Sequence, residues 1–125
     1  MNKFLFIANA VLTLPFGIAA LIAPVAVFAG FGIALDPGAQ LIARGYAATC
    51  IGYGCIFLLL RKNKSAEVTK ALLSGSILFN LIETLIQGMA GMTGTASPGI
   101  WGTVLAHAVM TLLSVVAFLK PTKGD

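Results

Sequence analysis

Charged residues are scarce in this chain of 125 residues. They make up 10% of the sequence, with only four acidic residues, whereas an average soluble domain carries about 25% charged residues. Hydrophobic residues make up 58%. A soluble fold of this length could not bury so much apolar surface. The composition therefore indicates an integral membrane protein and excludes a disordered chain.

The sequence also lacks the motifs that hold most metals and cofactors. It has no phosphate-binding glycine loop, no HExxH, no CxxC and no nucleophile elbow. Its two cysteines, Cys50 and Cys55, would point about 140° apart on one helix, which argues against a disulfide or a metal clamp. We therefore expect neither a metal nor a cofactor. No basic run is interleaved with aromatic residues, so we expect no nucleic-acid partner.

Four apolar segments are long enough to cross a bilayer, which takes about 20 residues in a helix. Their expected ranges are 4–23, 38–60, 67–92 and 98–119. All four lie within a single transmembrane domain over residues 1–125. Residues 24–35 are too few to span and are expected to form an interfacial loop or short helix. The short connections favour an all-α, antiparallel four-helix bundle with up-down-up-down order.

Capping residues mark where three of these segments begin. Asp36 precedes Pro37 and Ser97 precedes Pro98, which is typical of an N-cap followed by the first helical residue. Ser65 provides a third N-cap. We expect helices to begin directly after these three residues.

Basic residues gather on one side of the predicted bundle. That side carries Lys3, Arg61, Lys62, Lys64, Lys70, Lys120 and Lys123. The opposite side carries Asp36 and no basic residue. Because basic loops remain in the cytoplasm, we expect both termini to be cytoplasmic. The basic residues would then lie against anionic lipid headgroups of the cytoplasmic membrane.

Three ionisable residues lie inside the predicted spans, where charges are costly and usually face the bundle interior. They are Arg44, Glu83 and His107, on the second, third and fourth segments. With a rise of about 1.5 Å per residue, they lie about 9, 13 and 14 Å below the outer end of their helices. We therefore expect their side chains to meet. Asn80 and Gln87 share the helical face of Glu83 and would join the same cluster.

This polar cluster has three interpretations. In the structural one, Arg44 and Glu83 form a buried ion pair, and the remaining side chains complete the hydrogen bonds that fix helix register. In the functional one, the cluster is an outward-open site that binds a small hydrophobic or amphipathic ligand or carries a proton. In the third, a partner subunit supplies the counter-charge.

Small residues form a stripe on the second segment. Ala48 and Gly52 are four residues apart, and Gly45 extends the same surface. This spacing lets two membrane helices approach closely, so we expect contact with a helix of this chain, of a second copy or of another membrane protein. The face expected to point into the bundle consists of Arg44, Ala48, Ile51 and Cys55.

The stretch from Pro24 to Asn63 resembles part of a known group of proteins. Its matching positions are Pro24, Phe31-Gly32, Arg44, Gly45 and Gly52. In these residues the chain resembles small bacterial four-span membrane proteins of the DoxX-like and related groups. The resemblance implies a four-helix bundle in a bacterial cell membrane. The oxidoreductase-linked members of the group imply association with a quinone or a redox partner.

Three functions are compatible with the sequence. The first is an accessory or assembly subunit that acts through helix–helix contacts. The second is a small-ligand binding or transport protein that uses Arg44, Glu83 and His107. The third is a membrane enzyme with Glu83 and His107 as acid and base on a lipid-soluble substrate. A cavity among the helices would favour ligand binding, and a dry, packed interior would favour the accessory role.

Overall fold

The computed structural model describes residues 2–120, and all regular secondary structure within them is helical. The helices are α1 (Asn2–Ile22), α2 (Pro24–Ala29), α3 (Pro37–Leu60), α4 (Ala66–Met92) and α5 (Ile100–Phe118). All except α2 are long and apolar enough to cross a membrane. The predicted all-α fold with four spans is confirmed, and a short helix follows the first span. Lys123 lies outside the described residues.

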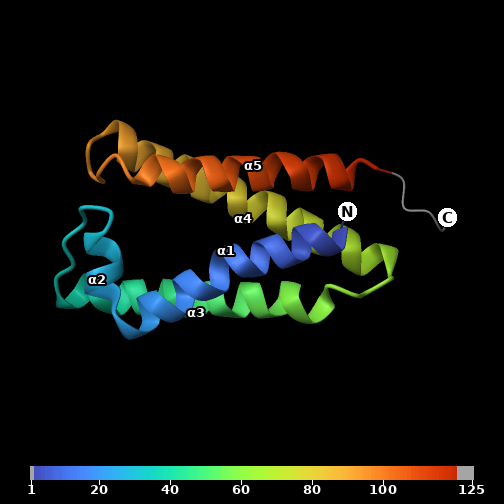
Figure 1. The fold of residues 1–125 in the computed structure, drawn as a ribbon, viewed down its shortest axis with the longest axis horizontal. Helices are drawn as coiled ribbons and strands as arrows, with labels where there is room; N and C mark the ends of the chain where they lie inside the picture. Colours follow the sequence, from blue (N-terminus) through green and yellow to red (C-terminus); the bar gives the residue numbers. More distant parts are fainter. Residues whose placement is uncertain (1, 121–125) are drawn as a thin grey trace.

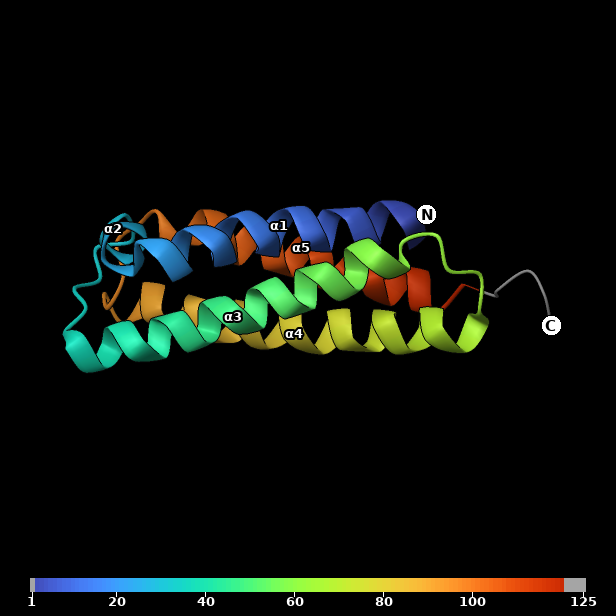
Figure 2. The ribbon, with the colours of Figure 1, turned by 90° about the horizontal axis from the view of Figure 1, so that it is seen from below.

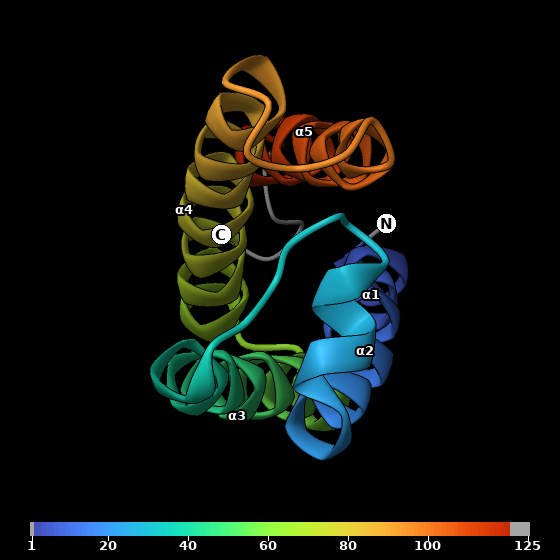
Figure 3. The same ribbon diagram turned by 90° about the vertical axis from the view of Figure 1, so that its left-hand side faces the viewer.

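The four long helices pack as two antiparallel pairs, α1 with α3 and α4 with α5 (Figure 1). Seen from the end that carries α2, they stand at the four corners of the bundle (Figure 3). Backbone contacts between the pairs run mainly from α1 to α5. The α3 and α4 backbones stay further apart, and these helices meet through side chains, such as the stacked rings of Tyr53 and Phe79. We call the end with α2 the α2 end. The opposite end, where the chain begins and the α3–α4 loop turns, is the terminal end (Figure 2).

Two of the three predicted helix caps are present. The Asp36 carboxylate accepts a hydrogen bond from the Ala39 amide at 2.7 Å, and α3 begins at Pro37 as expected. The Ser65 hydroxyl accepts one from the Val68 amide at 3.3 Å at the start of α4. Local capping chemistry therefore sets the start of both helices.

The predicted cap at Ser97 is wrong. Helix α5 begins at Ile100, after Gly99, and no side chain caps it. Ser97 instead belongs to a contact between two loops, in which its amide donates to the Phe31 carbonyl at 2.7 Å. Gly32 lies in this contact with a φ of 72°, a conformation that favours glycine. This bond ties the α2–α3 and α4–α5 loops together across the α2 end.

Glycines allow α1 and α3 to pack closely. A Cβ at Gly17 would lie 2.9 Å from the Ala47 carbonyl oxygen, and a Cβ at Gly54 would lie 2.6 Å from Thr13 Oγ1. The buried residues of α3 are Ala43, Ala47, Cys50, Gly54 and Phe57. The expected inward face, which began at Arg44, is therefore wrong by one position, or about 100° of rotation. The side chains at Ala43, Ala47 and Gly54 are small, so the backbones of α1 and α3 can approach each other closely.

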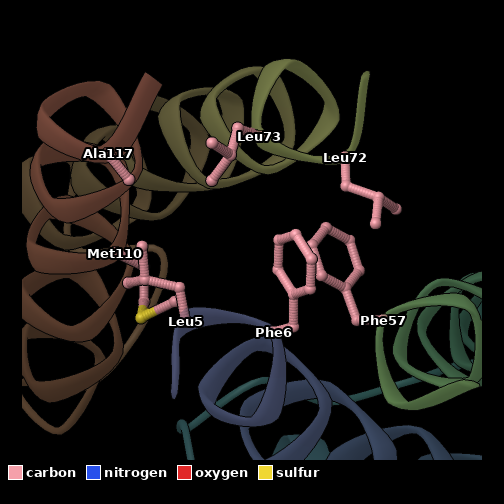
Figure 4. Close-up of a cluster of buried hydrophobic side chains, with 7 residues drawn as sticks. All are labelled: Leu5, Phe6, Phe57, Leu72, Leu73, Met110 and Ala117. Atoms are coloured by element: carbon pink, nitrogen blue, oxygen red, sulfur yellow. The ribbon is translucent and has the colours of Figure 1, made fainter. Parts of the chain in front are cut away.

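Apolar side chains from all four long helices fill the half of the bundle nearer the terminal end (Figure 4). The cluster consists of Leu5, Phe6, Phe57, Leu72, Leu73, Met110 and Ala117. The rings of Phe6 and Phe57 meet edge to face, with centroids 5.4 Å apart. This cluster closes the terminal half of the bundle interior.

The outward faces of the helices are apolar. Leu41, Leu59 and Leu112 expose 73%, 77% and 64% of their surface. Such a surface suits contact with lipid chains rather than water. The N-terminus and the basic loop at residues 61–64 lie together at the terminal end, as the sequence predicts (Figure 1). That this end is cytoplasmic stays a prediction.

Candidate functional site

A layer of polar side chains crosses the middle of the bundle, next to the apolar cluster. We call this layer the polar seam. Its members are Asn9, Tyr53, Ser76, Asn80, His107 and Ser114. They come from α1, α3, α4 and α5, so their hydrogen bonds join all four long helices. All but Tyr53 are buried.

The Asn9 carboxamide lies at the centre of the polar seam. Its Nδ2 donates to Ser76 Oγ and to the Leu5 carbonyl, both at 3.0 Å. Its Oδ1 accepts from the Tyr53 hydroxyl at 3.0 Å and from Asn80 Nδ2 at 3.1 Å. Asn9 thereby uses both of its polar atoms, and buried polar groups with all partners in place fix helix register.

A second amide links the polar seam to His107. Asn80 Nδ2 donates to Asn9 and to the Ser76 carbonyl, which leaves Asn80 Oδ1 as an acceptor. His107 Nδ1 lies 2.8 Å from that oxygen, so Nδ1 carries the proton in this hydrogen-bond network. In the neutral ring Nε2 is then an acceptor. No side chain among residues 2–120 uses it, and His107 lines a cavity beside the seam.

This cavity has a volume of about 540 Å³ and occupies the half of the bundle nearer the α2 end. All four long helices line it, and Phe28 of α2 and Phe31 of the following loop close it toward the α2 end. The two helix pairs diverge in this half, as Figure 1 shows. Most of the wall is apolar, and five of its residues carry aromatic rings other than histidine: Phe16, Phe28, Phe31, Tyr46 and Phe79.

The cavity opens between α3 and α4. Two of its lining residues, Ile42 of α3 and Ile86 of α4, are 75% and 58% exposed on the outer surface of the bundle. The backbones of the helices that carry them are not in close contact. The cavity thus reaches the apolar outer surface of the bundle between α3 and α4.

Glu83 and Gln87 supply the strongest polar groups of the cavity wall. Gln87 Nε2 donates to Glu83 Oε2 at 2.8 Å, while Gln87 Oε1 is buried without a hydrogen-bond partner. Tyr46, on the facing helix α3, interacts electrostatically with Glu83. Glu83 and His107 thus line one cavity, and no hydrogen bond joins them directly within the described chain.

The predicted ion pair between Arg44 and Glu83 is wrong. The structure contains no ion pair between acidic and basic side chains among residues 2–120. Arg44 is exposed on α3, and its Nε donates to the Leu21 carbonyl of α1 at 3.4 Å. Because α3 turns Ala43 and Ala47 toward α1, Arg44 points outward, and its long side chain reaches along the helix pair.

No protein-family model, curated protein or solved structure matches this chain.

The structure divides the predicted site residues into three groups. Asn80 belongs to the polar seam and Glu83 and Gln87 to the cavity, while His107 belongs to both. Arg44 lies apart from all of them.

The stripe of Gly45, Ala48 and Gly52 is exposed, and a Cβ at either glycine would meet nothing within 4 Å. It therefore packs against no helix of this chain.

Ser76 and Tyr46 are among the site residues that the sequence did not indicate. Ser76 bonds to Asn9 and Ser114 at the centre of the polar seam. Its position, four residues before Asn80 on the same helical face, would have identified it. Tyr46 lines the cavity opposite Glu83. Its role depends on the rotation of α3, which composition does not reveal.

Proposed function

We propose that this protein binds a small lipophilic molecule within the membrane, as a binding or transport component. The observation that carries the proposal is the largely apolar cavity of about 540 Å³, which opens between α3 and α4. Ligand pockets in proteins commonly have volumes of about 300–1,000 Å³ and are lined by apolar and aromatic side chains with a few polar groups. The cavity matches this description in both size and lining.

The division of labour inside the bundle supports the proposal. The polar seam satisfies its own hydrogen bonds and joins all four long helices, so it suffices to hold the helices in register. Glu83 and Gln87 take no part in the hydrogen bonds of that seam. A carboxylate in a membrane span costs free energy. Helix register does not require the Glu83 carboxylate, so ligand binding would account for its presence.

A bulky side chain in the cavity tests this function. Ala90 lines the cavity, so Ala90→Phe should occupy it, whereas Ala71→Phe makes the same change on the exposed surface of α4. Wild type and both variants would be extracted with their native lipids, purified, and analysed for bound small molecules by mass spectrometry. We expect a molecule retained by wild type and Ala71→Phe and lost from Ala90→Phe. Equal retention by all three proteins, or no retained molecule, would contradict the proposal.

An accessory role through helix–helix contacts is a second candidate. The observation that favours it is the exposed stripe of Gly45, Ala48 and Gly52, which has no neighbour in this chain. A helix of a second copy or of another membrane protein would pack there. Gly52→Leu should then shift the protein to a smaller species on a native gel. Gly75→Leu, at an equally open and exposed glycine of α4, is the control and should leave the species unchanged.

A further inference from the structure

Resting on the proposed function, we infer that the ligand is an amphipathic amine, bound as a cation, whose ammonium group pairs with Glu83. The cavity combines an acidic side chain with a largely apolar, aromatic wall. A ligand that matches both features carries one positive charge on an apolar body. Three features of the wall support this inference: its charge, its aromatic rings and its hydrogen-bond acceptors.

Glu83 is the only carboxylate among the residues that line the cavity, and no lysine or arginine lines it. The groups that interact with Glu83 carry no positive charge: they are the Gln87 amide, the Tyr46 hydroxyl, the Cys50 thiol and the His107 ring, which donates its one N–H to Asn80. Arg44 is held on the outer surface by the Leu21 carbonyl. A carboxylate removed from water is stabilised strongly by an opposite charge, and here a ligand would have to supply it.

Aromatic rings stand beside the carboxylate. The ring of Phe16 meets those of Phe28 and Tyr46 edge to face, at centroid distances of 6.1 and 5.9 Å. Tyr46 in turn interacts with Glu83, so this row of aromatic rings extends to the acidic side chain. Aromatic faces attract cations by about 0.5–2 kcal/mol, and more strongly in dry sites. The same rings offer an apolar surface to the body of the ligand.

The wall offers hydrogen-bond acceptors that lack donors. Gln87 Oε1 is buried and has no partner, and His107 Nε2 is an acceptor because Nδ1 donates to Asn80. Together with the Glu83 carboxylate, these atoms suit a protonated amine, which carries up to three N–H donors on one charged centre. An anionic ligand would meet the Glu83 charge, and a neutral hydrocarbon would leave the His107 acceptor without a donor.

Three probes of one shape test the inference: 4-phenylbutylamine, which is cationic at pH 7, the neutral pentylbenzene, and the anionic 5-phenylpentanoate. Their binding would be measured by equilibrium dialysis against the protein in phosphatidylcholine nanodiscs, with empty discs subtracted. We expect wild type to bind the amine most tightly. Glu83→Gln should weaken binding of the amine by about tenfold or more and leave binding of pentylbenzene unchanged. Glu67→Gln removes the same charge at an exposed position of α4 and should have no effect.

The outcomes separate this inference from the proposed function. If pentylbenzene binds as tightly as the amine, and Glu83→Gln changes the binding of neither probe, the inference of a cationic ligand is overturned. The proposal that the cavity binds a lipophilic molecule is then unaffected. If Ala90→Phe leaves the binding of every probe unchanged, the cavity itself is overturned. Weaker pentylbenzene binding by Glu83→Gln would show a damaged fold. Glu83→Asp then decides the question, since amine binding retained in it supports the charge pairing and amine binding lost overturns it.

Discussion

His107 Nδ1 lies 2.8 Å from Asn80 Oδ1, at the boundary between the polar seam and the cavity. Asn80 takes part in the hydrogen bonds that join the helices, whereas His107 also lines the cavity wall. The amide therefore determines which ring nitrogen faces the cavity as an acceptor. Changes in the seam can therefore reach the cavity through this bond.

Asn80→Leu should destabilise the bundle. The variant keeps the side-chain size but removes the bonds to Asn9, Ser76 and His107, so we expect a loss of about 1–3 kcal/mol. Reversible unfolding in mixed detergent micelles would measure it. Thr49→Val is the control, because its exposed hydroxyl bonds only to the Gly45 carbonyl of its own helix. An Asn80→Leu protein as stable as that control would show that the seam does not hold the helices.

Gly54→Val should separate α1 from α3. Its Cβ would lie 2.6 Å from both Thr13 Oγ1 and Leu14 Cγ, so the helices must move apart at a cost of about 1–3 kcal/mol or more. Gly75→Val makes the same substitution at an open position of α4, outside the stripe of Gly45, Ala48 and Gly52. Thermal unfolding of the two variants in detergent would compare them. Equal midpoints would contradict the close packing of these helices.

Arg44 and Glu83 should be energetically independent. Arg44 bonds to the Leu21 carbonyl and Glu83 to Gln87, so the two side chains share no partner. In a double-mutant cycle with Arg44→Gln and Glu83→Gln, we expect a coupling energy below about 0.5 kcal/mol. The free energies of unfolding of the four proteins give this coupling. A coupling above about 1 kcal/mol would instead support an ion pair between the two side chains.

The orientation in the membrane is testable with single cysteines. In a background with Cys50→Ala and Cys55→Ala, Thr95→Cys places a thiol at the α2 end and Lys64→Cys one at the terminal end. A membrane-impermeant maleimide added to intact bacterial cells should label only the first, because basic loops remain inside. Labelling of Lys64→Cys alone would show the opposite orientation. As a control, both thiols should be labelled in permeabilised cells.

The spans could be predicted from the sequence because their signals are local. Long apolar runs define the four helices, and Asp36 and Ser65 cap two of them through bonds to amides three residues away. Ser97 does not cap a helix, because α5 begins only at Ile100, and its amide donates to the distant Phe31 carbonyl. Sequence spacing cannot report such a contact.

The site could be predicted only in part, for a similar reason. The common face of Asn80, Glu83 and Gln87 follows from helical spacing, but the division between seam and cavity does not. That division depends on how α3 is rotated. The rotation is set by steric contact at Gly17 and Gly54, which packs Ala47 against α1 and leaves Arg44 outside.

The central position of Asn9 has a consequence for assembly. The ribosome delivers α1 first, and the Asn9 partners Ser76 and Asn80 follow 67 and 71 residues later. Before a partner from another helix arrives, the carboxamide bonds only to the Leu5 carbonyl of its own helix, and this placement in lipid is costly. Tyr53 follows only 44 residues after Asn9 and belongs to the helix that packs beside α1. Its hydroxyl can therefore satisfy Asn9 during synthesis, before the second half of the chain has entered the bilayer.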